Sequence, residues 1–407
     1  MIGDADNALG LYISIPFCRS KCTYCNFASG VYPASEHARY VSRLIQDLAG
    51  AGDWAARMGV HLPRRVDTIY FGGGTPSLLE PALLAQLFAA IRAEFNVDAD
   101  AEITVECAPG QLAGPTLEAL VAAGVNRVSL GVQSFVDSES HGSGRLHSRA
   151  TVEADLRRLR VAGIDDLNVD LIAGLAGQTA SSWNESLRAL LDADVPHASV
   201  YMLEVDEDSR LGRELLSGGA RYHAGLVPID DAIAAMYTRA IEFLNDAGLE
   251  QYEISNFSRA GCQSRHNLRY WQRRPYLGLG LDASSMLKEP GGSRDGYVLR
   301  SSTTDELRAY LDGTELPETA WLSPARQHEE AWFLGLRLKA GVNVADLERE
   351  FGRAMVEPAL ETVACLADNG LLITDGESVR LTGSGRLLSN DVFQEFLQAA
   401  DETSVRG

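Results

Sequence analysis

Three cysteines near the start of the chain have the residue type and the spacing for metal chemistry. The sequence has 407 residues and six cysteines, and Cys18, Cys22 and Cys25 follow the spacing C-x3-C-x2-C. Closely spaced thiols serve disulfides, zinc sites and iron–sulfur clusters. Because the gaps between them are short, all three sulfurs can reach one small inorganic centre.

We expect neither an export signal nor a membrane span. Its first residues, Met1–Asp6, carry acid where a secretory signal carries base, and no apolar run reaches the roughly 18 residues that a spanning helix needs. We therefore expect a cytoplasmic protein. In that reducing compartment close cysteines are metal-binding or catalytic more often than disulfide-bonded, which leaves zinc and iron–sulfur chemistry.

The number of cysteines favours an iron–sulfur cluster with one open iron. A [4Fe-4S] cluster needs four ligands, so three cysteines leave one iron free to bind a small molecule, as the open position of a catalytic zinc does. Cys107 is the nearest further thiol, but it neighbours Glu106 at a strand end, where adjacent side chains point to opposite faces. Cys262 and Cys365 lie far away in the sequence and are expected to be inert. A zinc-binding scaffold built on the three cysteines is the alternative.

The chain is strongly acidic, with 36 Lys and Arg against 56 Asp and Glu and a formal net charge of −20. This charge repels phosphate backbones and anionic membranes, so we expect no nucleic-acid partner. Residues 321–407 have the pattern of helices followed by a small hairpin, which is typical of a winged helix. They hold 8 basic and 14 acidic residues, so the basic surface of a DNA-binding domain is missing.

Six strand-like runs alternate with amphipathic helical segments in residues 1–248. The strands are predicted at 11–17, 66–71, 101–106, 126–132, 166–172 and 198–204, and the helices at 35–58, 78–95, 114–123, 149–162, 180–193 and 229–247. Such a series predicts a parallel sheet with helices outside, curled as a partial barrel. Residues 249–320 are predicted to be an irregular extension. Residues 321–407 are predicted to be a C-terminal helical domain, with a hairpin at 371–374 and 378–381 and a last helix at 384–399.

The cysteine spacing, with Tyr24 just before the third cysteine, resembles the radical SAM superfamily. Five further stretches are similar to the branch that contains oxygen-independent coproporphyrinogen III oxidase and the haem chaperone HemW. They are Phe71–Ser77 (FGGGTPS), Leu130–Phe135 (LGVQSF), Asp170–Leu175 (DLIAGL), Tyr252–Phe257 (YEISNF) and His266–Trp271 (HNLRYW). The resemblance implies an α/β fold with a partial (β/α)6 TIM-like barrel. It also implies a [4Fe-4S] cluster on Cys18, Cys22 and Cys25 whose open iron binds S-adenosylmethionine (SAM).

The residues at the carboxyl ends of the predicted strands are suited to SAM. Three glycines after the second strand let backbone N–H groups approach a ligand, although the ending of a P-loop is absent. The resemblance implies that Glu106 accepts from the SAM ammonium, that Arg145 pairs with its carboxylate, and that Gln133 and Asp170 hold the ribose hydroxyls. The full set implied to bind SAM is Tyr12, Tyr24, Gly73, Gly74, Thr75, Glu106, Gln133, Arg145 and Asp170.

Two features separate the chaperone from the oxidase. The oxidases have an extra cysteine two places after the third ligand, where this chain has Phe27, and a long segment before the first strand, where this chain has about ten residues. The motif His266-Asn267-x-x-Tyr270-Trp271 marks the chaperone branch and implies that His266 ligates haem iron, with Trp271 stacking on the macrocycle. The chain departs from the family turn G-x-G-x-G-A-H-S, because Asp282 and Ser284 replace its third glycine and its histidine.

The resemblance therefore implies a haem chaperone that carries a [4Fe-4S] cluster and SAM, with haem as cargo. The expected partners are haem-accepting apoproteins, membrane-bound ones among them, and a second copy of the chain. Four arginines in an otherwise acidic chain are expected to meet haem propionates or an acidic partner; they are Arg265, Arg269, Arg273 and Arg274. The alternative is an oxygen-independent coproporphyrinogen III oxidase, which decarboxylates its porphyrinogen substrate. No catalytic residue is assigned.

Overall fold

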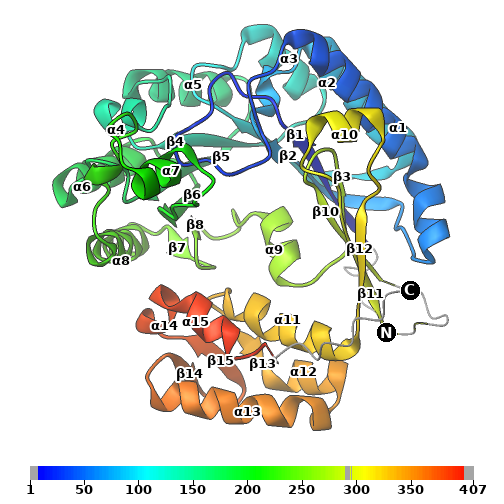
Figure 1. The fold of residues 1–407 in the computed structure, drawn as a ribbon, viewed down its shortest axis with the longest axis vertical. Helices are drawn as coiled ribbons and strands as arrows, with labels where there is room; N and C mark the ends of the chain where they lie inside the picture. The colour runs from blue at the N-terminus through cyan, green and yellow to red at the C-terminus, as the bar shows by residue number, and fades with distance from the viewer. Residues whose placement is uncertain (1–7, 289–293, 295, 398–407) are drawn as a thin grey trace.

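One curved sheet dominates the computed structural model, which describes residues 8–288, 294 and 296–397 (Figure 1). Its twelve strands run in the order β12-β11-β10-β9-β1-β2-β3-β4-β5-β6-β8-β7. The first six are β1 (Leu9–Ile15), β2 (Arg65–Gly73), β3 (Asn96–Cys107), β4 (Arg127–Gln133), β5 (Asp166–Ala173) and β6 (His197–Met202), and each pairs in parallel with the next. This confirms the predicted α/β partial barrel.

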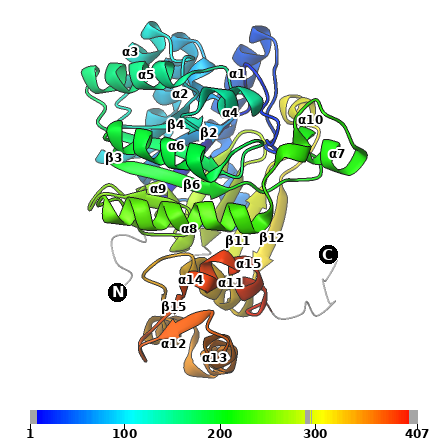
Figure 2. The same ribbon diagram turned by 90° about the vertical axis from the view of Figure 1, so that its left-hand side faces the viewer.

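The helices that follow these strands cover the outer face of the sheet (Figures 1 and 2). They are α1 (Ala34–Met58), α2 (Pro81–Glu94), α3 (Gly114–Ala122), α4 (Asp137–Gly142), α5 (Arg149–Val161), α6 (Ala180–Asp192) and α8 (Asp230–Asp246). The short helix α7 (Arg210–Ser217) instead projects beyond the barrel (Figure 2) and bonds to the loop at Lys21 and Thr23. Along β1, alternate residues such as Leu11 and Ile13 belong to the main hydrophobic core. The residues between them, Gly10, Tyr12 and Ser14, face the concave inner side, because side chains alternate along a strand.

Residues 249–320 are more regular than the sequence predicted. They contain β7 (Glu250–Gln251), β8 (Asn256–Ser258), α9 (Arg265–Trp271), β9 (Tyr276–Leu279), β10 (Ser284–Lys288), β11 (Val298–Ser302), α10 (Leu307–Asp312) and β12 (Glu318–Leu322). β8 extends the sheet beyond β6, and β9 pairs in parallel with β1 at the other edge. The prediction of an irregular segment is wrong because these strands have two to five residues, too few for a period-2 pattern to be recognised.

The C-terminal part forms a second core below the barrel in both ribbon views (Figures 1 and 2). It consists of α11 (Pro324–Leu336), β13 (Val342–Asn343), α12 (Val344–Phe351), α13 (Arg353–Asp368), the hairpin β14 (Leu372–Thr374) and β15 (Ser378–Leu381), α14 (Gly383–Leu387) and α15 (Ser389–Gln394). The three helices and the hairpin match the prediction. The prediction of a single last helix at 384–399 is wrong, because the helix is interrupted at Leu388, which separates α14 from α15. Residues 398–407 lie outside the described residues.

In the described part of the chain, no helix is both long and apolar enough to cross a membrane.

The short helix α9 lies against the inner face of the sheet and is fixed there by a buried arginine. Arg269 is fully buried, forms an ion pair with Asp67, and donates to the carbonyls of Ala8 and Pro275 at 3.0 and 2.9 Å. Gly10 on β1 makes room for it, since a Cβ there would lie 2.5 Å from the Arg269 Cδ. The helix that carries the HNxxYW motif is thus held on β1 and β2 from within the barrel.

We expect Arg269→Ala to lower the free energy of unfolding by about 3 kcal/mol, since it leaves the buried Asp67 carboxylate with only the longer contact to Arg274 at 3.4 Å and removes the donor to the carbonyls of Ala8 and Pro275. Arg269→Lys keeps the charge but loses the fork of donors, so an intermediate loss is expected. Urea unfolding of the purified protein measures both. Arg308→Ala, at a side chain that is 92% exposed, is the control and should change stability by less than about 0.5 kcal/mol. A similar small change in Arg269→Ala would contradict this role.

Candidate functional site

The three predicted ligand cysteines lie on the loop that leaves the carboxyl end of β1. The Cys18 amide donates to the Gly30 carbonyl at 2.8 Å, and the Lys21 ammonium donates to the carbonyls of Phe27 and Ser29 at 3.1 and 3.0 Å. These bonds fold the loop back on itself. Cys18, Cys22 and Cys25 are half-buried free thiols on it.

The thiols are within electrostatic reach of one another. Burial raises the pKa of the Cys18 thiol, and Cys25 and Cys22 add to the rise. The hydroxyl of Thr75 donates toward the Cys18 sulfur at 4.0 Å. Among the residues that the structure describes, no three His, Cys, Asp or Glu side chains are drawn together as a closed metal-binding group. The role of the three cysteines as cluster ligands therefore stays a prediction.

Glycines at the end of β2 let this turn pack directly against the cysteine loop. Gly73 has a φ of +98°, and a Cβ on Gly74 would lie 2.8 Å from the carbonyl oxygens of Ile15 and Phe17. The amides of Gly74 and Thr75 donate to those two carbonyls at 2.8 Å each. These two amides are thus engaged within the protein, contrary to the expectation that they are free to face a ligand.

The predicted SAM residues on β3 to β5 gather beside this turn. A Cβ on Gly131 would lie 3.0 Å from an Arg145 Nη and 3.2 Å from the Gln133 Nε2, so both side chains cover that glycine. Arg145 also donates to the hydroxyl of Tyr24 at 3.2 Å, which connects the group to the cysteine loop. Asp170 accepts from Asn168 at 2.7 Å. The strand ends therefore bring Tyr24, Gln133, Arg145 and Asp170 to one edge of the sheet.

Two buried polar atoms in this group have no hydrogen-bond partner within the described residues: the Gln133 Oε1 and the Arg145 Nε. Gln133 also has a φ of +69°, which a non-glycine residue rarely adopts. Unpaired buried groups and strained backbone are costly and cluster at ligand sites. An unpaired acceptor beside an unpaired donor suits a ligand that carries both hydroxyl and carboxylate groups, as SAM does.

The carboxylates of the site favour a positively charged ligand. Burial raises the pKa of Glu106 to about 7, and the nearby Asp170 carboxylate adds to the rise. Burial likewise raises the pKa of Asp170. The Tyr70 hydroxyl donates to Glu106 at 2.9 Å, and the ring of Tyr12 stacks on Tyr70 with centroids 6.2 Å apart. A cation at this position would relieve the repulsion between the two carboxylates.

The structure places His266 inside the protein with both ring nitrogens engaged. Its Nδ1 lies 2.9 Å from the Thr68 hydroxyl and its Nε2 lies 2.9 Å from the Tyr270 hydroxyl, and 1% of the residue is exposed. Burial lowers the pKa of His266 to about 3, with Arg269 adding to the effect, so the imidazole is neutral. In this conformation neither nitrogen is free to ligate haem iron.

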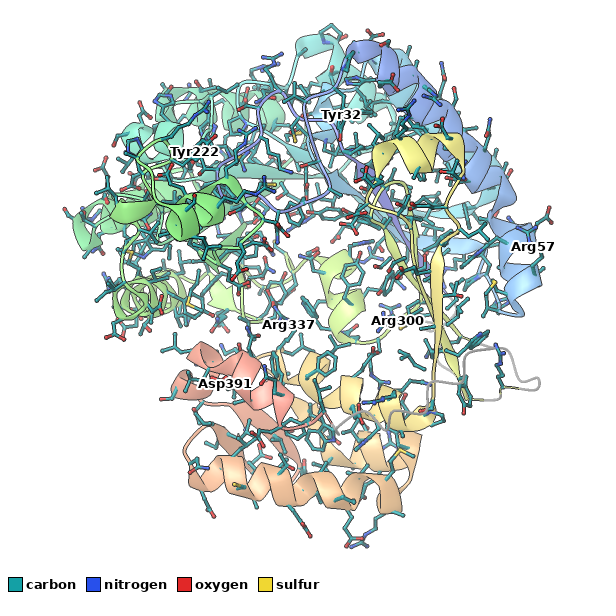
Figure 3. All side chains as sticks on the ribbon, viewed as in Figure 1. Tyr32, Arg57, Tyr222, Arg300, Arg337 and Asp391 are labelled. Carbon is teal, nitrogen blue, oxygen red and sulfur yellow. The ribbon has the colours of Figure 1, made fainter. Side chains whose placement is uncertain are left out.

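The other motif residues have different surroundings. Tyr270 is half-buried and its ring meets Tyr276 at 4.7 Å. The ring of Trp271 meets the C-terminal part: the guanidinium of Arg337, which is labelled in Figure 3, lies 4.2 Å from the centroid of the Trp271 ring. Arg337 thus covers one face of the Trp271 ring in this conformation, and the expected stacking of Trp271 on a macrocycle stays a prediction.

The four arginines around the motif do not form a free basic surface. Arg269 and Arg274 both pair with Asp67, and Arg273 forms a two-pronged ion pair with Glu350 on α12. The Arg265 side chain donates to a backbone carbonyl at 2.7 Å. The prediction of a site for propionates or an acidic partner overlooked these acceptors, which come from distant parts of the sequence.

Sequence reasoning missed Tyr70, which connects α9 to the strand ends. Its ring stacks on His266 with centroids 5.2 Å apart, and its hydroxyl binds Glu106. The available signal was the alternation along β2, which puts Thr68, Tyr70 and Gly72 on the inner face.

At the turn that departs from the family pattern, Asp282 has a φ of +52°, a conformation that the family's glycine adopts without strain.

Comparisons with known proteins agree with this architecture. The sequence matches the radical SAM superfamily over residues 12–190 and the HemN C-terminal domain over residues 322–388. It is 34% identical over 392 residues to the heme chaperone HemW of Bacillus subtilis, covering 95% of this chain and 98% of the relative. It is 31% identical to the heme chaperone HemW of Escherichia coli, covering 96% and 98%. The structure of coproporphyrinogen III oxidase (HemN) from Escherichia coli matches with a TM-score of 0.80 and 22% identity, over 96% of this chain and 90% of that chain.

The raised pKa of Glu106 predicts a pH-dependent stability. Because the folded protein binds this proton more tightly than the unfolded chain, the contribution is complete below the unfolded pKa of 4.5 and is lost as pH rises through about 7. We expect this loss to reach about 3 kcal/mol, and to be absent in Glu106→Gln. Urea unfolding between pH 4.5 and 7.5 measures it. Glu242→Gln, at a side chain that is 63% exposed, is the control; the same pH slope in Glu106→Gln and wild type would refute the assignment.

Proposed function

Because the chain belongs to the HemW family of radical SAM proteins, we propose that it is a haem chaperone that passes haem to acceptor apoproteins. The observation that carries the proposal is the group of unpaired polar side chains beside a loop of three thiols at the carboxyl edge of the sheet. We place the protein in the cytoplasm, with acceptors that include membrane-bound apoproteins and with a homodimer as its assembly.

The cysteine loop is the proposed site of a [4Fe-4S] cluster held by Cys18, Cys22 and Cys25. The donor set fits, since three free thiols on one short loop match the three protein ligands that such a cluster needs when one iron stays open. When bound, the cluster supplies that open iron and a one-electron couple. The bonds from Lys21 to the loop carbonyls keep the loop folded without using any thiol.

The unpaired atoms beside the loop are the proposed contacts of SAM. Glu106, once ionised, accepts from the SAM ammonium, and Arg145 offers its free Nε–H to the carboxylate. Gln133 and Asp170 hold the ribose hydroxyls. Because Glu106 has a pKa near 7, we propose that a bound cation lowers it and fixes the ionised form.

Haem is proposed to meet the inner face of the sheet above α9. Tyr270 is half-buried there, and its hydroxyl is held by the Nε2 of His266. A tyrosine oxygen can ligate haem iron. Burial raises the pKa of Tyr270 well above its usual value, so the bound iron itself would have to displace the hydroxyl proton. His266 itself can serve as the ligand only after leaving both Thr68 and Tyr270.

The alternative is an oxygen-independent coproporphyrinogen III oxidase in porphyrin biosynthesis, which the likeness to HemN keeps open. That likeness is one of fold. The position of the extra cysteine of the oxidases is occupied by Phe27, whose residue surface is 63% exposed. Phenylalanine has no thiol to offer, so the chaperone is the better supported of the two.

Metal analysis of the anaerobically reconstituted protein tests the cluster. We expect iron and acid-labile sulfide in equal amounts in wild type, and loss of both in Cys18→Ala, Cys22→Ala and Cys25→Ala, since each variant removes one of three ligands. Cys365→Ala, at an exposed thiol, should keep the cluster. Zinc without sulfide would instead support a zinc scaffold.

Haem titration followed by Soret absorbance tests the chaperone. We expect wild type to bind haem, Tyr270→Phe to bind at least tenfold more weakly with an altered Soret band, and His266→Ala to weaken binding by loosening the hold on Tyr270. Tyr222→Phe, on the loop after α7 (Figure 3), is the matched control. An unchanged spectrum in Tyr270→Phe with a shifted one in His266→Ala would return the ligand role to the histidine. Turnover of coproporphyrinogen with SAM and reductant, without tight haem binding, would favour the oxidase.

A further inference from the structure

A cavity of about 280 Å³ lies on the outer side of the barrel, away from the candidate site. It is bounded by α1, by the strands β9, β10 and β11, and by α10 with the residues that follow it. Leu277, Leu279, Ser285 and Ser301 form its floor. Leu277 and Leu279 on β9 pair in register with Leu11 and Ile13 on β1, whose side chains belong to the main hydrophobic core outside the sheet. The two leucines therefore point to the outer side, whereas Tyr276, the neighbour of Leu277, belongs to a separate cluster on the inner side.

Small residues keep the cavity open from both sides. On α1, Gly50 lies in the middle of a 25-residue helix, and a Cβ placed there would meet no atom within 4 Å. Glycine inside a helix is unfavourable relative to alanine. Since no neighbouring atom would clash with a Cβ at Gly50, close packing does not explain why glycine stands here. On the sheet, Ser285 on β10 pairs with Ser301 on β11, and their short side chains leave space between the sheet and α1.

The lining combines an apolar body with one unengaged positive charge. Trp54 and the two leucines supply apolar surface. Arg43 is engaged, because it pairs with Asp47 at 3.0 Å, and the second oxygen of Asp47 accepts from Tyr310 at 2.6 Å. Arg57 is exposed on α1 at the edge of the cavity (Figure 3), and within the described part of the chain it has no hydrogen bond or ion pair.

The charges at the opening favour one orientation of a ligand. Glu315 lies in the lining contributed by the segment after α10, opposite α1. An anionic group would be repelled from that side and attracted to Arg57. Small-molecule sites usually have about 300–1,000 Å³, mostly apolar walls and a few placed polar groups, so this cavity suits a compact ligand.

We propose that this cavity binds a small anionic amphipathic molecule, with one or two fused rings between Trp54 and the sheet and a carboxylate at Arg57. The inference does not rest on the proposed haem function, because every residue that carries it lies on the outer side of the sheet. The Ser285 hydroxyl is engaged by the Gly278 backbone at 3.0 Å, so the hydroxyl of Ser301 is the one proposed to bind a polar ring atom at the floor.

Isothermal titration calorimetry of the full chain with naphthalene-2-carboxylate tests the proposal, with naphthalene-2-carboxamide as the neutral analogue. We expect saturable binding at one site, several-fold tighter for the carboxylate. Arg57→Ala should remove that difference, and Arg57→Lys should retain most of it. Arg308→Ala, at an exposed arginine on α10, is the control and should bind as wild type does.

Filling the cavity provides the second arm of the test. Gly50→Leu and Ser301→Leu block it from the helix side and from the sheet side, and each should weaken binding at least tenfold. Either variant suffices if the other does not fold. No saturable binding in wild type, or equal binding in wild type and a folded filled variant, would overturn the proposal. Haem binding and cluster content are expected to be unchanged in Arg57→Ala, so failure here is separable from failure of the chaperone function.

Discussion

The parallel register of β1 and β2 determines where all the candidate chemistry lies. Ile15 pairs with Gly73, so the two strands end together and the cysteine loop leaves β1 next to the glycine turn that follows β2. The amides of Gly74 and Thr75 then bond to the carbonyls of Ile15, the last residue of β1, and of Phe17 just beyond it, which fixes the two turns on each other. Because β3, β4 and β5 continue in parallel, Glu106, Gln133 and Asp170 reach the same edge. Without this shared edge, residues that lie up to 152 positions apart in the sequence, from Cys18 to Asp170, would have no common site.

At that edge of the sheet, several charged and polar groups are not fully paired within the described residues. Glu106 and Asp170 are close enough to raise each other's cost of ionisation, and Arg145 offers only part of its guanidinium to protein partners. A protein selected for stability alone would pair or replace such groups. Together with the strained backbone at Gln133, these groups support the proposal that a charged ligand binds at this edge.

The sequence predicted the parts of the molecule in which local pattern and tertiary environment agree. All six βα units are where the alternation of apolar strands and amphipathic helices indicated, because long repeated elements leave a strong periodic signal. The strands β7 to β12 were not predicted, because a strand of two to five residues carries almost no period and is stabilised by neighbours far away in the sequence. The break at Leu388 was likewise invisible, since the residues around it keep helical spacing on both sides.

At the site, residue types could be predicted but partners could not. The acids and amides at strand ends follow from the fold, whereas the burial of His266 depends on Thr68, and the loss of a basic surface depends on Asp67 and Glu350. Each of these partners lies at least 70 residues away from the group it engages. No motif of six residues contains that information.

The neighbours of His266 explain why its imidazole is neutral. A charged imidazole at His266 would lie buried beside Arg269, and both effects lower its pKa, so the proton is absent and the ring can both accept and donate. Its face rests on Tyr70, and the hydroxyl of Tyr70 binds Glu106. One side chain therefore separates α9 from the carboxylate that would receive a cation. Tyr70 therefore contacts both the proposed acceptor of the SAM ammonium and the histidine of α9.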